Sequence, residues 1–512
     1  MLTGDPSSHS VTTAPRPRIW PWAAGSILIP LLIISATLFG HRLALQARLA
    51  AQVAPAPTLP PITVNAVVAA PGQISNLALD ARTQTLVATF INATSARLSG
   101  VAFYDSVTGA HKGESAAPGD ASGPFALTDT LRGETYLVGA GGVTIFDDAT
   151  GQRTSAYANP TTIYATAAGL DERLGIIYTF DPSTSDTLSS AGTLNAFAAS
   201  DGSPIASVKL PAISGLPPEQ APQITVDSDA GRVYVFVGGH NQPEPLLAYN
   251  ASDLSPLGSW RTPADLALGP FDAETHTLYF GRADRTVWSL DLTALPSGAT
   301  AQTISPQQIP SLSGASRFGF GRAGVSLVMS GDGVVSIVPA GAPNPYAMLP
   351  LVHAPSGFAA DAAPWMLPID TASQLAYLPG DDNSLLIVSL KRPASHAAPN
   401  AVTAALIARA GMTRLLPDTN QNPPFLSATT FPVTFGSVPR QYFIHYSDLG
   451  WKGPYAGTAS LGDVKAGGRP GDYIMTFSIT WHQLFLRQHS WTVEVISDGR
   501  TRLLSDSGDA IP

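Results

Sequence analysis

Six aspartates recur along the chain in one sequence context, and they are the residues whose type and spacing could do chemistry. They are Asp80, Asp129, Asp171, Asp227, Asp272 and Asp370. A ring of carboxylates could ligate a metal ion or act as general acids and bases. Each aspartate, however, stands directly before a polar turn, whose amides its oxygens can accept. Because catalysis needs carboxyl groups in unlike environments, six equivalent aspartates favour a structural role in turns.

The other residue types that carry chemistry form no recognisable motif. The ten histidines are scattered, and the spacing of His482 and His489 matches no metal motif. The sequence contains neither His-Glu-x-x-His nor the nucleophile-elbow pattern Gly-x-Ser-x-Gly. The acidic turns at 227–229 and 380–383 lack the twelve-residue loop of a calcium site. We therefore assign no catalytic, cofactor-binding or metal-binding residue and expect no cofactor.

Tryptophans could stack on sugars, but packing is the default interpretation for them. They lie at positions 260, 288, 365, 451, 481 and 491.

The six aspartates mark a repeat that must position them. Seven residues after each comes a valine or tyrosine: Val87, Tyr136, Tyr178, Tyr234, Tyr279 and Tyr377. Successive aspartates are 49, 42, 56, 45 and 98 residues apart, and the last interval is twice the first. We therefore expect a degenerate unit near Gly321 and Val328, over residues 311–350, and seven units in all. A period of about 40 to 50 residues in a β-rich chain predicts a β-propeller with one four-stranded sheet per unit.

The expected ends of the third strands recur with a period similar to that of the aspartates. We expect the third strand of each unit to end at Tyr104, Phe146, Phe197, Tyr249, Leu290, Val338 and Leu390. In three units a glycine five residues later, Gly109, Gly151 or Gly202, indicates a turn into the outer strand. Residues 62–70 are β-prone, whereas the last unit has three evident strands. The N-terminal run is expected to complete the last sheet, which removes exposed strand edges.

The pattern of Asp, then Tyr-Val, then an apolar strand and Asp-x-x-Thr-Gly, as at 147–151, resembles the YVTN-type propeller repeats of bacterial surface and envelope proteins. The resemblance covers about residues 62–391 and is poor in the sixth unit. It implies an all-β fold with a seven-bladed β-propeller. It implies architecture more than function, because propellers serve both binding proteins and enzymes. An irregular β-sandwich is the alternative fold.

Composition and charge narrow the function classes. The net charge is −9 without a basic cluster, which argues against nucleic-acid binding. The absence of cysteine excludes disulfides, thiolate metal sites and cysteine nucleophiles.

Residues 19–39 carry no charged side chain over 21 positions. At 1.5 Å per residue such a run spans about 30 Å, the thickness of a bilayer core. We predict an uncleaved transmembrane anchor at 19–40 after a disordered cytoplasmic tail at 1–18. A cleavable signal peptide ending near Ala54 to Ala56 is the alternative. Because flanking arginines are nearly balanced, the placement of a large C-terminal ectodomain outside the cytoplasm follows from the family resemblance.

The segments flanking the propeller have different compositions. Residues 41–61 form a stalk, whose proline-rich part at 54–61 favours polyproline II and would make a spacer of about 25 Å. Residues 392–512 are expected to form a small β-rich (α+β) domain packed on the propeller. Its expected elements are a helix at 401–416 capped by Asn400 and stopped by Pro417, strands at 441–446 and 473–482, and a hairpin turning at Asp498-Gly499.

These observations favour a membrane-anchored cell-envelope protein whose propeller is a non-catalytic binding scaffold. Its expected partners are the membrane, through residues 19–39, and an unidentified protein or polysaccharide on a propeller face. The alternative is a propeller enzyme, such as a lactonase-like hydrolase or a glycan lyase, with a site in the central funnel.

Overall fold

The computed structural model describes most of the chain between residues 53 and 508. The described ranges are 53–54, 58–91, 98–116, 125–139, 142–158, 167–181, 192–210, 223–236, 245–263, 266–272, 275–282, 287–295, 298, 302–303, 306–308, 315–321, 325–330, 334–339, 342, 344–351, 367–380, 384–394, 397–415, 440–445, 454–461, 464–482 and 486–508. The predicted tail and transmembrane anchor therefore lie outside the described residues. No helix within the described ranges has the length and apolar character to cross a membrane.

Over the repeat region, the described strands form seven successive sheets, each with four antiparallel strands. Sheet 1 contains β3 (Gln73–Asp80), β4 (Thr85–Ile91), β5 (Leu98–Asp105) and β6 (His111–Ala116), and sheet 2 contains β7 (Phe125–Asp129), β8 (Glu134–Gly139), β9 (Gly142–Asp147) and β10 (Gln152–Tyr157). Sheet 3 contains β11 (Ala167–Asp171), β12 (Ile176–Asp181), β13 (Thr193–Ala198) and β14 (Pro204–Lys209). Sheet 4 contains β15 (Gln223–Asp227), β16 (Arg232–Phe236), β17 (Pro245–Asn250) and β18 (Pro256–Arg261), with β22 (Gln302–Thr303) added at the edge. Sheet 5 contains β19 (Leu266–Asp272), β20 (Thr277–Arg282), β21 (Val287–Asp291) and β23 (Gln307–Gln308). Sheet 6 contains β24 (Ala315–Gly321), β25 (Val325–Ser330), β26 (Val334–Pro339) and β27 (Ala347–Pro350). Sheet 7 contains β28 (Ile369–Asp370), β29 (Leu375–Pro379), β30 (Ser384–Ser389) and β2 (Val64–Ala69).

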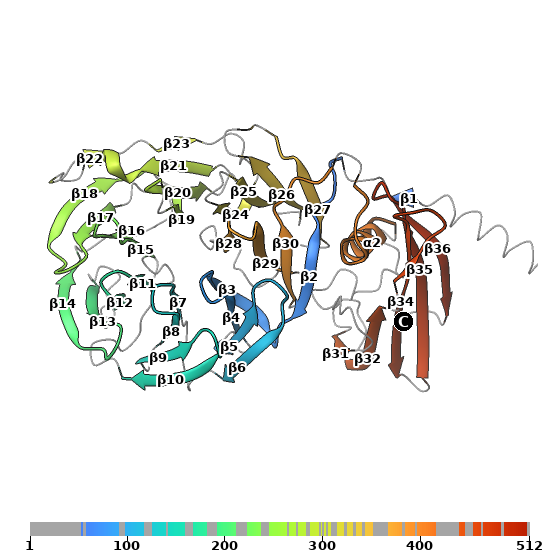
Figure 1. Cartoon of the computed structure of the whole chain (residues 1–512), viewed down its shortest axis with the longest axis horizontal. Helices are drawn as coiled ribbons and strands as arrows, with labels where there is room; N and C mark the ends of the chain where they lie inside the picture. The colour runs from blue at the N-terminus through green and yellow to red at the C-terminus, as the bar shows by residue number, and fades with distance from the viewer. Residues whose placement is uncertain are drawn as a thin grey trace, which may run out of the picture. The chain divides into compact units, whose positions relative to one another are not determined.

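These sheets follow one another around a ring with their first strands innermost (Figure 1). The first strand β3 contacts β7, β7 contacts β11, and β11 contacts β15, while β29 and β30 of the last sheet contact β3. The fold is therefore all-β and propeller-like. The expectation for residues 311–350 is confirmed to the extent that four strands, β24 to β27, form a sheet there.

The last sheet is completed from the N-terminal side, as the sequence predicted. Strand β2 pairs antiparallel with β30, so that one sheet combines residues more than 300 positions apart. The preceding residues lie along β27: Ile62 N–H donates to Met348 O, and Met348 N–H donates to Pro60 O, both at 3.0 Å. Strand β1 (Val53–Ala54) pairs with the C-terminal sheet. These pairings differ from the free spacer predicted for the stalk, because backbone groups at 53–54 and 60–62 find partners in two sheets.

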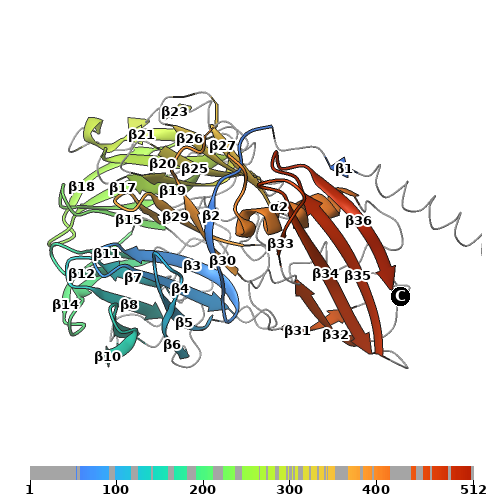
Figure 2. The same ribbon diagram turned by 45° about the vertical axis from the view of Figure 1, so that its right-hand side comes forward.

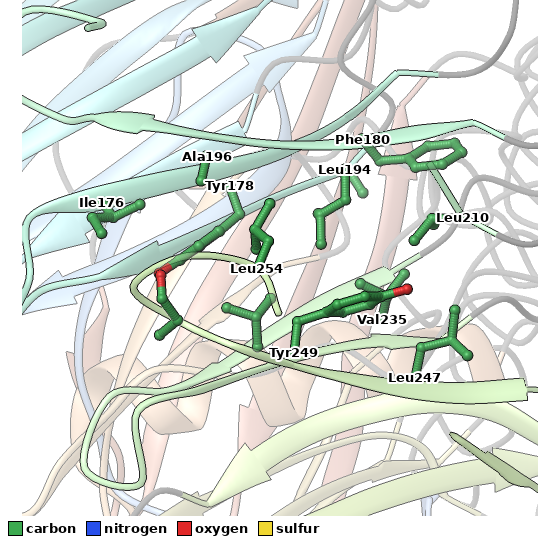
Figure 3. Close-up of a cluster of buried hydrophobic side chains, with 13 residues drawn as sticks. Ile176, Tyr178, Phe180, Leu194, Ala196, Leu210, Val235, Leu247, Tyr249 and Leu254 are labelled. Atoms are coloured by element: carbon green, nitrogen blue, oxygen red, sulfur yellow. The ribbon is translucent and has the colours of Figure 1, made fainter. Parts of the chain in front are cut away.

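Alternating residues of the middle strands pack against two different neighbours. In β16, Val233 and Val235 lie in the core shared with sheet 3, whereas Tyr234 and Phe236 lie in the core shared with sheet 5. Figure 3 shows the first core, where Tyr178 and Leu194 of sheet 3 face Val235, Leu247 and Tyr249 of sheet 4. Because the side chains of a strand alternate between faces, a sheet packed between two others is apolar on both. The sequences of the middle strands are accordingly continuous runs of mostly apolar residues.

The chain beyond sheet 7 forms a helix, α2 (Ala401–Leu415), and a seven-stranded sheet. The strands of this C-terminal sheet are β1, β36 (Thr501–Gly508), β35 (Leu486–Val495), β34 (Tyr473–His482), β32 (Pro454–Leu461) and β31 (Arg440–His445), with β33 (Lys465–Ala466) paired to β34. Figure 2 shows β31, β32, β34, β35 and β36 side by side. The predicted hairpin is confirmed at Gly499, whose φ is 87° and whose N–H donates to Ile496 O.

Helix α2 joins this sheet to the ring. Its predicted cap is confirmed, because Asn400 Oδ1 accepts Thr403 N–H at 2.8 Å. A register shift between Val64 and Ala66 interrupts the β2–β30 ladder. Val64 N–H then donates to Thr403 Oγ1 and Val64 O accepts from Asn400 Nδ2, each at 2.9 Å. Helix α2 also contacts β27 of the ring and β35 and β36 of the C-terminal sheet.

Candidate functional site

The two ends of the ring are built differently. Because consecutive strands run antiparallel, the turn from the first to the second strand and the turn from the third to the fourth lie at the same end of each sheet. We call this the turn end and the opposite one the connection end. The six recurring aspartates lie at the turn end, each at the last residue of a first strand.

The aspartates hold turns, as the sequence predicted. Each accepts at least one N–H from the residues two or three positions later, at 2.9–3.4 Å. Five of the six are buried, with exposures of 5% or less: Asp80, Asp129, Asp171, Asp227 and Asp370. Burial is tolerated because these carboxylates receive charge-assisted hydrogen bonds. An aspartate engaged with turn amides has fewer lone pairs left for a ligand.

The fourth residue after each aspartate has a left-handed backbone. These residues are Gln84, Gly133, Gly175, Gly231, His276 and Gln374, with φ between 50° and 72°. Each of their carbonyls accepts an N–H from just beyond the third strand of the same sheet, from Ser106, Asp148, Ala199, Ala251, Leu292 and Leu390 respectively. The sequence analysis did not predict this bond. It ties the two turns of every such sheet together.

In three of the six turns the left-handed residue is a glycine, and an arginine of the preceding sheet lies against it. Arg82, Arg132 and Arg173 reach from sheets 1, 2 and 3 over Gly133, Gly175 and Gly231 of the next sheet. A Cβ added at Gly133 would lie 2.0 Å from Arg82 Nη2, and one added at Gly175 would lie 2.8 Å from Arg132 Nη2.

Two of these arginines also bond to the neighbouring turn. Arg82 Nε donates to Thr130 O and Arg132 Nη1 donates to Glu172 O, both at 2.8 Å. The sheets that precede Gln84 and His276 around the ring have no arginine in their aspartate turns, at 371–374 and 228–231 respectively. His276 instead reaches back, and its Nδ1 lies 2.8 Å from Asp227 Oδ2. Aspartate, arginine and glycine spacing could have revealed this pattern in the sequence.

At four of the contacts between neighbouring sheets, a side-chain hydroxyl of one sheet donates a hydrogen bond to a backbone carbonyl of the next. We call this bond a hydroxyl strap. Its acceptor is always the carbonyl of the residue that directly follows the third strand of the neighbouring sheet. The bonds run from Thr85 Oγ1 to Asp148 O, from Tyr157 OH to Ala199 O, from Tyr178 OH to Ala251 O and from Tyr346 OH to Leu390 O, at 2.5–2.9 Å. Each strap thus pairs one carbonyl in an interface, where an unpaired carbonyl would be costly.

Burial raises the pKa of several groups at this end. It raises the pKa of Asp148 to about 7, with Asp80 adding repulsion and Thr135 acting in the opposite direction. Burial also raises the pKa of Glu172, although that carboxylate accepts from Thr130 N and Oγ1. In contrast, the Ser255 N–H and hydroxyl lower the pKa of Asp253 in an exposed turn. Asp148 is therefore the carboxyl closest to titrating at neutral pH among these groups.

The other candidate residues join no chemical site in the described part of the chain. No group of three or more His, Asp or Glu side chains that could hold a metal ion occurs there. Asp227 is engaged by Ala230 N and His276, and residues 381–383 of the second acidic turn lie outside the description. Trp260 and Trp491 are 2% exposed and pack in cores, and Trp288 is half-buried. The side chains of Trp365, Trp451, Trp481, His482 and His489 lie outside the description.

The innermost strands carry few titratable groups. Over β3, β7, β11, β15, β19, β24 and β28, these are the terminal aspartates and Arg317 of β24. An acid and base pair would need two carboxyl groups in unlike surroundings facing one space. The six terminal aspartates instead share one environment at the turn end.

Comparisons with known proteins give limited guidance. No family model matches the chain. A search of curated proteins finds no match. Among solved structures, the crystal structure of Chaetomium thermophilum Raptor is similar over 66% of this chain and 29% of that chain, with 10% sequence identity and a TM-score of 0.47. At that score the similarity carries no argument about function.

Proposed function

We propose that this chain is a membrane-anchored protein of the bacterial cell envelope, with a seven-bladed β-propeller that serves as a non-catalytic scaffold for a protein or a surface polymer. The observation that carries the proposal is the difference between the aspartate turns and the segments at the connection end. All six aspartate turns contain four residues between their strands. At the connection end, the segments between strands range from two residues at 140–141 to 11 at 182–192, 13 at 210–222 and 18 at 351–368.

Segments of unequal length on a regular scaffold are where binding surfaces usually lie. The turn end is tied by aspartates, arginines and hydroxyl straps, so changes there alter packing. Segments at the connection end can vary without breaking these ties. The engagement of the aspartates with turn amides supports a binding role over the acid and base chemistry of a funnel enzyme.

Membrane attachment is the second part of the proposal and depends on residues 19–39. Their uncharged run is long enough to cross a bilayer. We expect the full-length protein to stay with membranes through a carbonate wash. Release of the intact chain would contradict an anchor, and a mature N-terminus near residue 57 would establish cleavage.

Binding is tested with the full-length protein in detergent. Residues 182–192 or 210–222 are replaced by short glycine-serine segments, and cosedimentation with isolated bacterial envelope material is measured. We expect binding to fall at least tenfold while the melting temperature is unchanged. Leu131→Ser, at a 65% exposed residue of the turn end, is the matched control and should bind normally. Turnover of lactones or glycans that is abolished by Asp227→Ala without a change in melting temperature would contradict the scaffold.

A further inference from the structure

The contact between sheets 1 and 2 contains a buried carboxyl group where other sheets have a neutral side chain. The equivalent residues, each directly after the end of a third strand, are Ser106, Asp148, Ala199, Ala251, Leu292 and Leu390. All six are buried, with exposures between 0% and 8%. Asp148 is the one acid among them.

No described group neutralises the Asp148 carboxyl. Its exposure is 0%, and neither Oδ1 nor Oδ2 accepts a hydrogen bond of normal geometry from the described residues. The neighbouring Thr135 hydroxyl lowers the pKa of Asp148, but burial raises it by more. The carbonyl of the same residue is satisfied by Thr85 Oγ1 at 2.7 Å. An ionised carboxyl in this position would be buried without a partner, which is among the costliest arrangements in a protein.

A second carboxyl from the neighbouring sheet faces this position. Asp80 is also 0% exposed, and it acts on the titration of Asp148 as a like charge. Its Oδ1 accepts Arg82 N–H and Thr83 N–H, and its Oδ2 accepts the Thr83 hydroxyl. Asp80 is thus held by three donors of its own turn, and no such turn donor reaches the Asp148 carboxyl. The proton of the pair therefore belongs on Asp148.

The other charged groups around Asp148 do not replace that proton. From sheet 1, the Lys112 ammonium donates to Thr83 O, Gln84 O and Thr85 Oγ1, and Arg82 donates to Thr130 O. From sheet 2, Asp147 adds repulsion and is paired across the strands with Glu134. No ion pair to Asp148 occurs among the described residues. Lys112 and Arg82 are thus committed to backbone and hydroxyl oxygens, and Arg132 of the adjoining turn is paired with Asp129.

We propose that Asp148 is a proton-operated latch between the first two sheets of the ring. In the closed state its protonated carboxyl donates a hydrogen bond to the Asp80 carboxylate. When the proton leaves to solvent, two like charges face each other in a dry interface, and the interface loosens to admit water. The group is protonated more strongly in the folded chain than in the unfolded one. Its contribution to stability is therefore complete below the unfolded pKa and is lost as pH rises through neutrality.

The repeat itself supplies the variants for a test. Asp148→Ala introduces the residue found at 199 and 251, Asp148→Ser introduces that found at 106, and Asp148→Asn keeps the shape without the charge. Asp229→Asn, at an exposed acid in another turn, is the matched control. Amide hydrogen exchange of the full-length protein is measured at pH 5.5 and 8.5, with rates corrected for intrinsic exchange.

We expect β4, β5, β8 and β9 to lose protection at pH 8.5 relative to pH 5.5, on the order of tenfold to thirtyfold, while β12, β13, β16 and β17 change little. The three Asp148 variants should abolish this difference, and Asp229→Asn should retain it. An equal pH dependence in the Asp148 variants would overturn the proposal. So would restoration of wild-type protection at pH 8.5 by Na⁺ or Ca²⁺ alone, because that result would identify a cation site.

Discussion

The turn end and the connection end of the same ring follow different rules. At the turn end, all six aspartate turns have four residues between their strands, and arginines and hydroxyls bond neighbouring sheets to one another. At the connection end, segments range from two to 18 residues between strands. This contrast teaches that the sheets are held by one end, which leaves the other free to vary. Changes at the turn end should therefore alter stability, and changes at the connection end should alter binding.

The largest effect is expected when a carboxyl is placed in a turn-end interface that lacks one. Ala251 is 0% exposed in the core shared by sheets 3 and 4. Asp at this position would be buried among apolar side chains, so Ala251→Asp should lower the free energy of unfolding by about 3 to 5 kcal/mol at pH 8. Chemical denaturation measures the loss, and Ala251→Ser is the control. A decrease of less than about 1 kcal/mol in the free energy of unfolding would show that water hydrates the new carboxylate in the interface.

The next effect is the pH dependence contributed by Asp148. Burial raises its pKa from 3.8 to about 7. A raised carboxyl pKa stabilises the fold fully below about pH 4, and this stability is lost as pH rises to about 7. The shift corresponds to at most about 4 kcal/mol. Asp148→Asn should therefore flatten the wild-type decline of stability between pH 4 and 7.5, as followed by denaturant unfolding. Parallel curves for the two proteins would contradict this assignment.

The arginine and glycine pattern predicts an asymmetric pair of substitutions. Gly133→Gln places a side chain against Arg82 in a left-handed backbone and should cost about 1 to 2 kcal/mol. Gln84→Gly, at the equivalent residue without an arginine above it, should change stability by less than about 1 kcal/mol. The melting temperatures of the two variants measure these losses. Equal losses of stability would show that Arg82 is not the reason for glycine at position 133.

Removal of one hydroxyl strap should have a smaller effect. Tyr178→Phe leaves Ala251 O without its donor in a buried interface. The expected loss is about 1 kcal/mol. Tyr249→Phe tests the loss of a phenol hydroxyl from the same core and has no strap to break. Identical effects of the two substitutions on the denaturation midpoint would show that the strap contributes nothing measurable.

Much of the ring could be predicted from the sequence because the same local physics is repeated. The Asp80-type turns, the closing strand at 62–70 and the Asn400 cap each depend on residues close in sequence or on one missing strand. The contacts of Arg82 with Gly133 and of Thr85 with Asp148 were missed because they join residues about 50 to 60 positions apart. The buried carboxyl group of Asp148 was also missed, since the acid occupies a turn position where exposure is the usual expectation. The bonds of residues 53–54 and 60–62 were missed because proline-rich sequence suggested a free spacer.

The most direct test of the scaffold proposal compares matched changes at the two ends of the ring. Residues 210–222 are shortened in one variant, and Gly133→Gln is introduced in the other. For both full-length proteins, the melting temperature and the affinity for isolated envelope material are measured. The account predicts lost binding with unchanged stability for the first, and lowered stability with wild-type affinity of the folded fraction for the second. Wild-type binding by the shortened variant, together with weakened affinity of folded Gly133→Gln protein, would place the binding surface at the turn end and contradict the account.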